Sequence, residues 1–323
     1  MNNQYPIKTV HPTFLRNVTF RKTLFLCGLG ICLLPFTSAP VALLLGIVMV
    51  QFIEHPFLAL NHKLIHILLQ ASVVGLGFGM NVDTTLKAGK EGVLLTIASI
   101  FGTLALGYFV GKVFKINKKT SALISVGTAI CGGSAIAAVA PVIKSDEKQT
   151  AIALGSVFIL NAMALFLFPF IGQQLHLTQT QFGMWSAIAI HDTSSVVGAA
   201  SHYGDKALQI ATTVKLARAL WIIPVAFLSG MAFRSKDAKV KIPYFIFLFV
   251  LAIVINTYVP AITKIDPYIT HLSKIGLTVT LFLIGSSLSK KVIMAVGLKP
   301  ILQGLILWII IASATLIAIV HLF

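Results

Sequence analysis

Residues 149–173 read QTAIALGSVFILNAMALFLFPFIGQ and contain no charged side chain. About 20 apolar residues in a helix cross the hydrocarbon core of a bilayer, and a helix satisfies its own backbone hydrogen bonds there. Comparable runs recur along the chain, at residues 23–53, 64–82, 92–110, 120–143, 182–190, 207–233, 242–259, 269–289 and 300–323. Pro35 and Pro40 divide the first run into two short helices. The sequence therefore predicts an all-α, polytopic membrane protein of about eleven membrane elements.

Composition supports the same class. Of 323 residues, 57% are hydrophobic and 11% are charged, whereas soluble domains carry about 25% charged residues. The net charge of +16 comes from lysines and arginines in short clusters between uncharged runs, which is the pattern of a membrane protein and not of a nucleic-acid-binding groove. The three cysteines form no CxxC pair, so no disulfide framework is expected.

Basic clusters give the orientation. No long polar loop divides the chain, so we expect a cytoplasmic N-terminal segment at 1–22 and a single transmembrane transport domain at 23–323. No cleavable signal peptide is evident, because residues 1–19 lack an apolar core. The four clusters are Lys8, Arg16, Arg21 and Lys22; Lys112, Lys115, Lys118 and Lys119; Arg234, Lys236, Lys239 and Lys241; and Lys290, Lys291 and Lys299. Positive residues stay inside, which predicts a plasma (inner) membrane protein with a cytoplasmic N-terminus.

Two runs contain breaks at their middle. Residues 120–143 carry Cys131-Gly132-Gly133-Ser134, and residues 182–203 carry His191-Asp192-Thr193-Ser194-Ser195. Adjacent glycines and runs of small hydroxyl residues interrupt helical hydrogen bonding, and broken helices at membrane depth are buried in protein or line a wet cavity. Re-entrant hairpins put more lysines and arginines on the cytoplasmic side than single crossings do, so this threading is favoured.

A weak internal repeat accompanies the two breaks. CGGSAIAAVAP from Cys131 resembles DTSSVVGAAS from Asp192, and a long apolar helix follows each. Residues 76–110 resemble residues 281–317 in the same general way. The hairpin threading gives the two members of each pair opposite orientations, which is typical of inverted-repeat transporters with a midplane site between discontinuous elements.

Several blocks resemble a known family. Residues 127–172, from GTAICGGSA to FPFIG, and WSAIAIHDTSSVVGAAS at 185–201 are similar to the YeiH family, whose members are named sulfate exporters. GLGFGMNV at 75–82 and KLARALWIIPVAF at 215–227 agree with the same family pattern. The resemblance implies a sulfur oxyanion or sulfonate as substrate. The chain also resembles, more distantly, inverted-repeat secondary transporters that include bile-acid and sodium–proton carriers.

His191 and Asp192 form an ionisable pair in an apolar segment, which marks a functional site by default. We hypothesise that Asp192 binds a proton or a cation, with His191 as its relay. The structural alternative is that Asp192 caps the helix that begins near Thr193.

Lys215 and Arg218 are one turn apart and share a helix face. They are candidates to neutralise Asp192 or to hold an oxyanion, because arginine suits bidentate anion contacts. A further set of small residues can offer backbone N–H groups to an anion at half-helix starts, or serve as a packing notch. This set is Gly132, Gly133, Ser134, Ser194 and Ser195.

Cys131 and Asn161 are supporting candidates. Cys131 fits a small buried apolar position, and Asn161 can bond the broken segment or join two helices. A metal site is not expected at Glu54, His55, His62 and His66, because these residues are irregularly spaced and lie near the membrane interface. Neither a cofactor motif nor an ATP-binding motif is present.

Three functions compete. The first is a secondary transporter of a small anion, proton-coupled through Asp192 and His191, working by alternating access. The alternative is a cation–proton antiporter with Asp192 as the ion site; one intramembrane acid against two bases favours the anion. An intramembrane enzyme with Ser194 or Ser195 as nucleophile is disfavoured, because consecutive side chains do not face each other on a helix. The expected partners are the bilayer and the small anion, and a homo-oligomer stays open.

Overall fold

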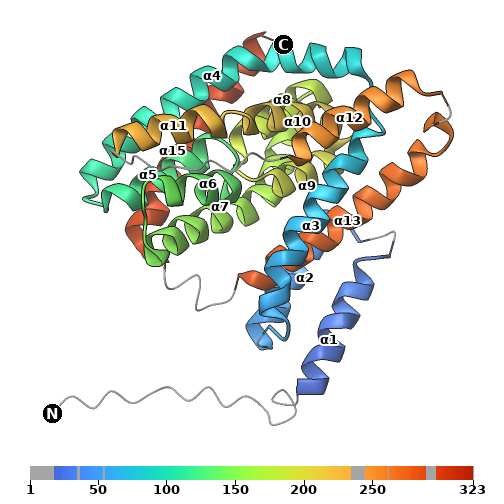
Figure 1. Cartoon of the computed structure of the whole chain (residues 1–323), viewed down its shortest axis with the longest axis horizontal. Helices are drawn as coiled ribbons and strands as arrows, with labels where there is room; N and C mark the ends of the chain where they lie inside the picture. Colours follow the sequence, from blue (N-terminus) through green and yellow to red (C-terminus); the bar gives the residue numbers. More distant parts are fainter. Residues whose placement is uncertain are drawn as a thin grey trace.

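The computed structural model describes residues 18–34, 37–53, 55–233, 244–260, 262–288 and 296–322. Within these ranges the chain is helical and contains no strand (Figure 1). Several predicted features lie outside the described residues, namely most of the N-terminal segment 1–22, Pro35, Glu54, the basic cluster from Arg234 to Lys241, and Lys290 with Lys291.

The helices follow the predicted apolar runs. They are α1 (Val18–Ile31), α2 (Ala39–Phe52), α3 (Leu58–Gly77), α4 (Val82–Val113), α5 (Lys118–Ala129), α6 (Gly133–Val142), α7 (Glu147–Gln174), α8 (Gln179–Ala189), α9 (Thr193–Tyr203), α10 (Asp205–Ala219), α11 (Ile222–Ala232), α12 (Phe245–Tyr258), α13 (Asp266–Ser287) and α15 (Leu298–Leu322), with a short 3-10 helix at Ile262–Lys264. In the part of the chain that the structure describes, five helical segments are long and apolar enough to cross a membrane: Gly92–Val113, Glu147–Gln174, Asp205–Ala232, Asp266–Ser287 and Leu298–Leu322. The total of eleven membrane elements stays a prediction.

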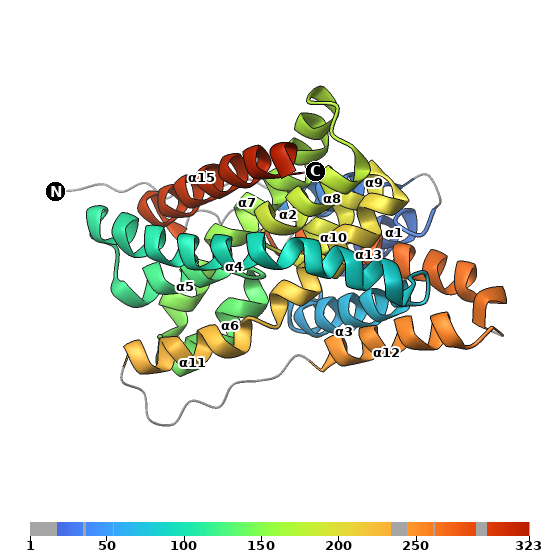
Figure 2. The same ribbon diagram turned by 90° about the horizontal axis from the view of Figure 1, so that it is seen from above.

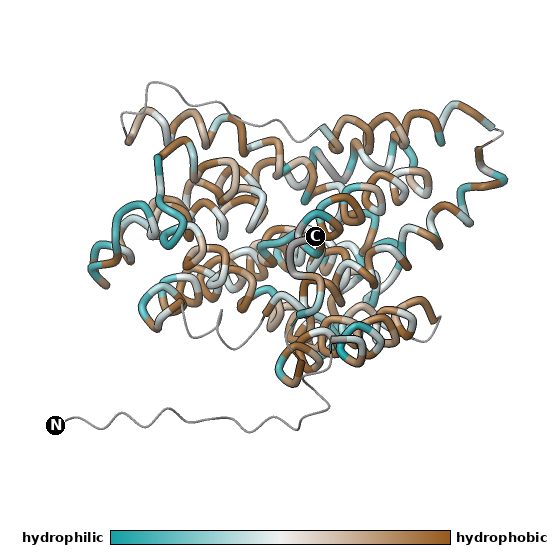
Figure 3. Tube along the Cα trace, turned by 60° about the horizontal axis from the view of Figure 1, so that its bottom comes forward, coloured by the Kyte–Doolittle hydropathy of each residue, from teal (hydrophilic) through white to brown (hydrophobic). Residues whose placement is uncertain are grey.

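The surface of the molecule is unusually apolar along the helix shafts. Leu94 is 77% exposed, and Phe247 and Ile317 are also exposed. Figure 3 shows hydrophobic residues running along the helices, while hydrophilic residues gather toward helix ends and connections. Apolar side chains of this size are stable on an outer surface when lipid tails cover them.

The sequence predicts one membrane helix over residues 207–233, whereas the structure has two, α10 and α11. The Trp221 N–H donates to the Arg218 carbonyl at 3.0 Å, and the Ile223 N–H donates to the Leu220 carbonyl at 3.2 Å, so the helix tightens here. Pro224 has no N–H with which to continue the helical ladder. A proline three residues into α11 therefore accounts for the break.

Both broken segments are hairpins. Lys119 at the start of α5 donates through Nζ to the carbonyl of Lys144, two residues beyond α6, at 2.6 Å. In the second segment, Gln179 at the start of α8 accepts a hydrogen bond at 3.0 Å from the N–H of Lys206, which follows α9. Each chain segment thus returns to the end from which it came. We call 118–144 the first hairpin and 179–206 the second hairpin.

The two hairpins enter from opposite ends of α7. Gln149 in the first turn of α7 bonds Asn117 at the base of the first hairpin, 3.3 Å away. At the other end, the Tyr203 hydroxyl of the second hairpin donates at 2.7 Å to the carbonyl of Leu177, just beyond α7. With 28 residues and a rise of 1.5 Å each, α7 is about 42 Å long. The hairpin tips consequently meet between these ends.

Apart from α1, the described helices form two groups. The panel consists of α2, α3, α12 and α13, in which α13 packs on α2 and α3, and α12 packs on α3. The hairpin bundle consists of α4 to α11 and α15 (Figures 1 and 2). Within the panel, α2 and α13 cross so closely that a side-chain carbon on Gly46 would lie 2.2 Å from the Phe282 carbonyl oxygen. The second hairpin reaches the panel, because α9 contacts both α2 and α13.

Candidate functional site

The tips of the two hairpins touch at Gly132 and Asp192. Gly132 has φ +63°, in the left-handed region that favours glycine. A side-chain carbon at this position would lie 3.4 Å from both Cα and Cβ of Asp192, and 3.3 Å from a methyl carbon of Val157 on α7. Glycine thus supplies the backbone turn and the close approach together.

Each tip combines the end of one half-helix with the start of another. In the first hairpin, α5 ends at Ala129 and α6 begins at Gly133. In the second, the Ile190 N–H donates to the Ser186 carbonyl as α8 ends, and Asp192 then caps α9. Two carbonyl-rich helix ends and two N–H-rich helix starts, with opposite partial charges, are therefore gathered in one region.

Lys215 and Arg218 of α10 bind the carbonyl-rich ends of both hairpins. Lys215 Nζ donates to the carbonyls of Ile130 at 3.1 Å, Ala187 at 3.3 Å and Ile190 at 2.7 Å. Both cationic side chains are fully buried. These bonds direct all three ammonium protons of Lys215 at main-chain oxygens.

Arg218 repeats this arrangement one turn further along α10. Its Nε donates to the Ala129 carbonyl at 2.8 Å, Nη2 donates to the same oxygen, and Nη1 donates to the Ile188 carbonyl at 3.0 Å. Lys215 and Arg218 thus join the first hairpin to the second through backbone acceptors. Lys215 and Arg218 lie side by side on α10, as predicted, and their N–H groups point at the two helix breaks.

Asn161 of α7 supports the second tip. Its Oδ1 accepts hydrogen bonds from the N–H groups of His191 at 3.2 Å and Asp192 at 3.3 Å. Asp192 in turn accepts a bond from the Ser195 N–H at 3.4 Å and one from the Ser194 hydroxyl. Asp192 therefore caps α9, as the structural alternative for this residue expects, while its proton- or cation-binding role stays a hypothesis.

Several buried polar atoms near the tips lack a protein partner within the described residues. They are Asn161 Nδ2, both ring nitrogens of His191, and the Thr128 hydroxyl. The His191 ring lies 6.3 Å from the Trp308 ring on α15, centroid to centroid. Buried polar groups are nearly always hydrogen-bonded, so unpartnered ones beside a helix break call for a ligand or water.

The starts of the two second half-helices differ. The α9 start is capped by the Asp192 carboxylate, whereas the α6 start has no side-chain cap. Gly132 and Cys131 are buried, Gly133 is half-buried and Ser134 is exposed. Ser194 and Ser195 are buried against Asp192. Of the predicted set, Ser134 stands apart from the buried cluster.

Charge in the buried core is unbalanced. Among the residues whose side chains the structure describes, a set that leaves out Glu91, the buried Asp, Glu, Lys and Arg side chains are Asp192, Lys215 and Arg218. The partial charges of the four half-helix ends are of opposite sign in equal numbers and approximately cancel. With all three side chains ionised, the core carries one positive charge in excess.

Sequence reasoning missed three polar or aromatic contributors. Thr128 precedes the first break and has a buried hydroxyl. Trp308 stacks on Phe168 beside the second tip. Gln303 of α15 donates to the Gly107 carbonyl at 3.2 Å and to the Ser121 hydroxyl at 2.8 Å. A lone glutamine in the apolar run 300–323 is the signal that finds Gln303, because polar residues in lipid join helices.

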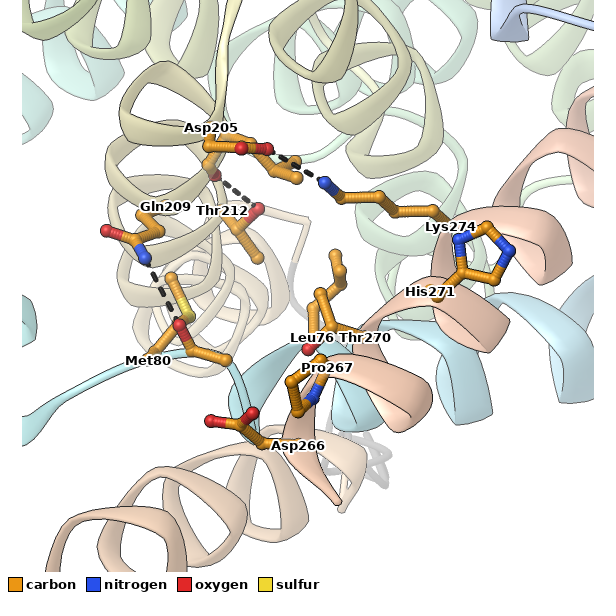
Figure 4. Close-up of a pocket in the computed structure, with 12 residues that line it drawn as sticks. Leu76, Met80, Asp205, Gln209, Thr212, Asp266, Pro267, Thr270, His271 and Lys274 are labelled. Atoms are coloured by element: carbon orange, nitrogen blue, oxygen red, sulfur yellow. Dashed lines mark hydrogen bonds and ion pairs between the residues drawn. The ribbon is translucent and has the colours of Figure 1, made fainter. Parts of the chain in front are cut away.

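A cavity of about 440 Å³ lies between the panel and the hairpin bundle. It is lined by the end of α3, the start of α10 and the start of α13 (Figure 4). Lys274 of α13 reaches Asp205 of α10 across it at 2.8 Å, and Gln209 of α10 donates to the Gly79 carbonyl at 3.1 Å. Its lining includes Thr212, one turn before Lys215 on α10.

Comparisons with known proteins identify the family to which this chain belongs. The family model described as conserved hypothetical protein 698 matches residues 26–304. The chain is 49% identical to a UPF0324 membrane protein of Bacteroides thetaiotaomicron, covering 96% of this chain and 94% of the relative. A UPF0324 membrane protein of Porphyromonas gingivalis is 52% identical, covering 87% and 88% respectively. No solved structure matches. The chain belongs to the UPF0324 membrane protein family.

Proposed function

We propose that this membrane protein is a secondary transporter of a small anion that binds between the two hairpin tips. The observation that carries the proposal is the excess of buried positive charge, with Lys215 and Arg218 against Asp192. An uncompensated charge in a membrane interior is costly, and one bound monovalent anion balances this core. Most N–H groups of Lys215 and Arg218 already donate to backbone carbonyls. In this proposal the two cations therefore attract the anion by their electric field and not by direct hydrogen bonds.

The start of α6 is the proposed contact point for the anion. Its first N–H groups lack a side-chain cap, while the equivalent start of α9 already holds a carboxylate. The positive end of a helix dipole favours an anion at such a position. Asn161 Nδ2 and the His191 ring provide unpartnered groups near the other tip. Gly133 and the Ser194–Ser195 turn complete the proposed site, and the exposed Ser134 lies in the first turn of α6 beside it.

Alternating access follows from the two helix groups. The hairpin bundle carries the proposed site and the panel faces it through α9. Movement of the bundle against the panel would expose the tips to one side and then the other, as in transporters with discontinuous midplane helices. The oppositely inserted hairpins are the proposed inverted repeat. The cavity between α10 and α13 is the proposed outer approach.

Asp192 and His191 are the proposed proton-coupling pair. Protonation of Asp192 would add one positive charge to the core and increase its attraction for an anion, so proton and anion would move together. The resemblance to sulfate exporters favours a sulfur oxyanion or sulfonate. The basic clusters, which the threading of the sequence puts on one side of the membrane, favour the plasma membrane, with the N-terminus in the cytoplasm.

We assign no enzymatic reaction. Nucleophilic catalysis requires a serine in hydrogen-bond reach of a base. The Ser194 hydroxyl bonds Asp192, and neither ring nitrogen of His191 has a bond from a described side chain. The pairing of serine with carboxylate is that of a helix cap.

Replacing Ser134 tests the proposed function with little risk to folding. Ser134→Asp puts a carboxylate on the uncapped α6 start, where an acid stabilises a helix by about 0.3–1 kcal/mol. Ser134→Asn is the uncharged match of similar size. We expect proteoliposomes with wild-type or Asn variant to take up labelled sulfate, sulfite or a small sulfonate saturably, and the Asp variant to lose at least about 90% of that flux.

Equal anion flux in the Asp and Asn variants would show that the anion does not use the α6 start. If no anion is transported by the wild type, while added sodium or potassium evokes proton movement, the chain is a cation–proton antiporter with Asp192 as its ion site.

A further inference from the structure

A second and larger cavity lies at the end of the molecule remote from the α10–α13 cavity. It has a volume of about 970 Å³ and is bounded by the last turns of α4, the first turns of α5, and α11. The cavity lies between α11, which packs on α6, and the α4–α5 pair. Figure 2 shows α5, α6 and α11 together at one end of the molecule, beside the end of α4.

The walls of this cavity are mostly apolar. Leu104, Val126, Val225 and Phe233 line it. Two of its polar wall residues, Ser121 and Ser125, already have partners: Ser125 Oγ donates to the Ser121 carbonyl at 2.7 Å, and Ser121 Oγ accepts from Gln303 at 2.8 Å. The interior therefore suits hydrocarbon better than a hydrated ion.

One end of the cavity is strongly basic. Lys112, Lys115 and Lys118 line it there and are exposed. Within the described chain no carboxylate pairs with any of the three. Lys118 also opens α5, whose N-terminal dipole adds positive potential. An anionic group at this end would meet three cations and a helix start.

The cavity also opens toward the lipid. Tyr108 is 66% exposed and Leu228 is 47% exposed, and both belong to the lining. A tyrosine near lysines at the end of an apolar helix is typical of the level of lipid headgroups. A chain from the bilayer can thus enter sideways while its headgroup stays at the lysines.

We infer that this cavity is a binding site for an anionic phospholipid, with the phosphate at Lys112, Lys115 and Lys118 and an acyl chain along α4 and α11. Charge complementarity selects the occupant, because basic pockets between membrane helices on the cytoplasmic side accept anionic headgroups. The inference is independent of the transported substrate, since the site shares none of its lining with the hairpin tips.

The experiment is native mass spectrometry of the purified chain titrated with cardiolipin, phosphatidylglycerol or phosphatidylcholine. We expect the wild type to bind one anionic lipid at least about tenfold more tightly than phosphatidylcholine. Lys112→Gln, Lys115→Gln and Lys118→Gln combined should abolish this preference. The matched control combines Lys87→Gln, Lys90→Gln and Lys206→Gln, three exposed lysines outside the cavity, and should retain it.

The apolar half of the site needs its own test. Ala122→Phe fills the cavity from α5 and should weaken anionic lipid binding, whereas Ala98→Phe, at an exposed position of α4 outside the cavity, should not. Thermal unfolding checks that each variant is folded. The inference is overturned if both lysine triples bind anionic lipid equally. It is also overturned if inorganic sulfate or phosphate at millimolar concentration displaces the lipid and binds Ala122→Phe normally, since the lysines would then hold a soluble anion.

Discussion

Asp192 caps α9 and, among the residues whose side chains the structure describes, carries the only buried acidic charge. One substitution can separate the helix-capping role of Asp192 from the role of its charge. Asparagine caps helices about as well as aspartate, so Asp192→Asn keeps the helix start and removes the charge. Asp146, which caps α7 by accepting from the Gln149 N–H at 2.7 Å, offers the same chemistry at an exposed position.

Asp192→Asn is expected to keep the helix cap and to make anion uptake insensitive to a pH gradient. The reason is that asparagine cannot exchange a proton in the working pH range. Uptake with and without an acid-outside gradient measures the effect, with Asp146→Asn as control. A normal response to the gradient in Asp192→Asn would remove the coupling role.

Lys215 binds three carbonyls that no helix can satisfy, because each lies at a helix break. Lys215→Met keeps the length of the side chain and removes the donor. Each buried carbonyl left unpaired costs about 1–3 kcal/mol, so a clear fall in the thermal unfolding temperature is expected. Lys206→Met, at an exposed position of the same helix, is the control, and equal stability of the two variants would contradict the assigned contacts.

The hairpins make a specific claim about topology. The bases of the first hairpin, including Lys118 and Lys144, should face one side of the membrane, and the bases of the second, including Gln179 and Lys206, the other. We expect single cysteines at these four exposed positions, in a chain with its own cysteines replaced, to react with an impermeant thiol reagent in those pairs. Labelling of Lys118→Cys and Lys144→Cys from opposite sides would mean a single crossing.

Local sequence composition predicted where the helices of the two hairpins break, but it did not predict which groups Lys215 and Arg218 contact. The Gly132–Gly133 pair and the 191–195 run identified both breaks, since these residue types weaken a helix. The partners of Lys215 and Arg218 are backbone carbonyls as distant as 89 residues in sequence, and no side-chain pattern encodes a carbonyl acceptor. The sequence therefore indicated an oxyanion cage, where the structure has these cations holding the two tips together.

Apart from α1, the described helices divide into a panel and a hairpin bundle, and the proposed transport by alternating access requires these two groups to move against each other. At the α10–α13 cavity they are joined by exposed polar contacts, the Lys274–Asp205 pair and the Gln209–Gly79 hydrogen bond. An exposed ion pair contributes at most about 1 kcal/mol, so this junction can open at little cost.

Linking Asp205→Cys to Lys274→Cys with a bifunctional thiol reagent is expected to stop anion flux, and a cleavable linker should restore it on reduction. The control link joins Asn117→Cys to Gln149→Cys, positions in contact within the hairpin bundle, and should leave flux intact. Full transport with the α10–α13 link in place would rule out motion of the bundle against the panel at this junction.

Charge balance in the core predicts the sign of the transported ion, so the most direct measurement compares anions with cations. Wild-type proteoliposomes are loaded with a pH-sensitive dye and given labelled sulfate, sulfite or a small sulfonate, and in parallel sodium or potassium. The account predicts saturable flux of one anion accompanied by protons, and no proton movement on addition of either cation. Proton movement evoked by a cation, without flux of any anion, would contradict it.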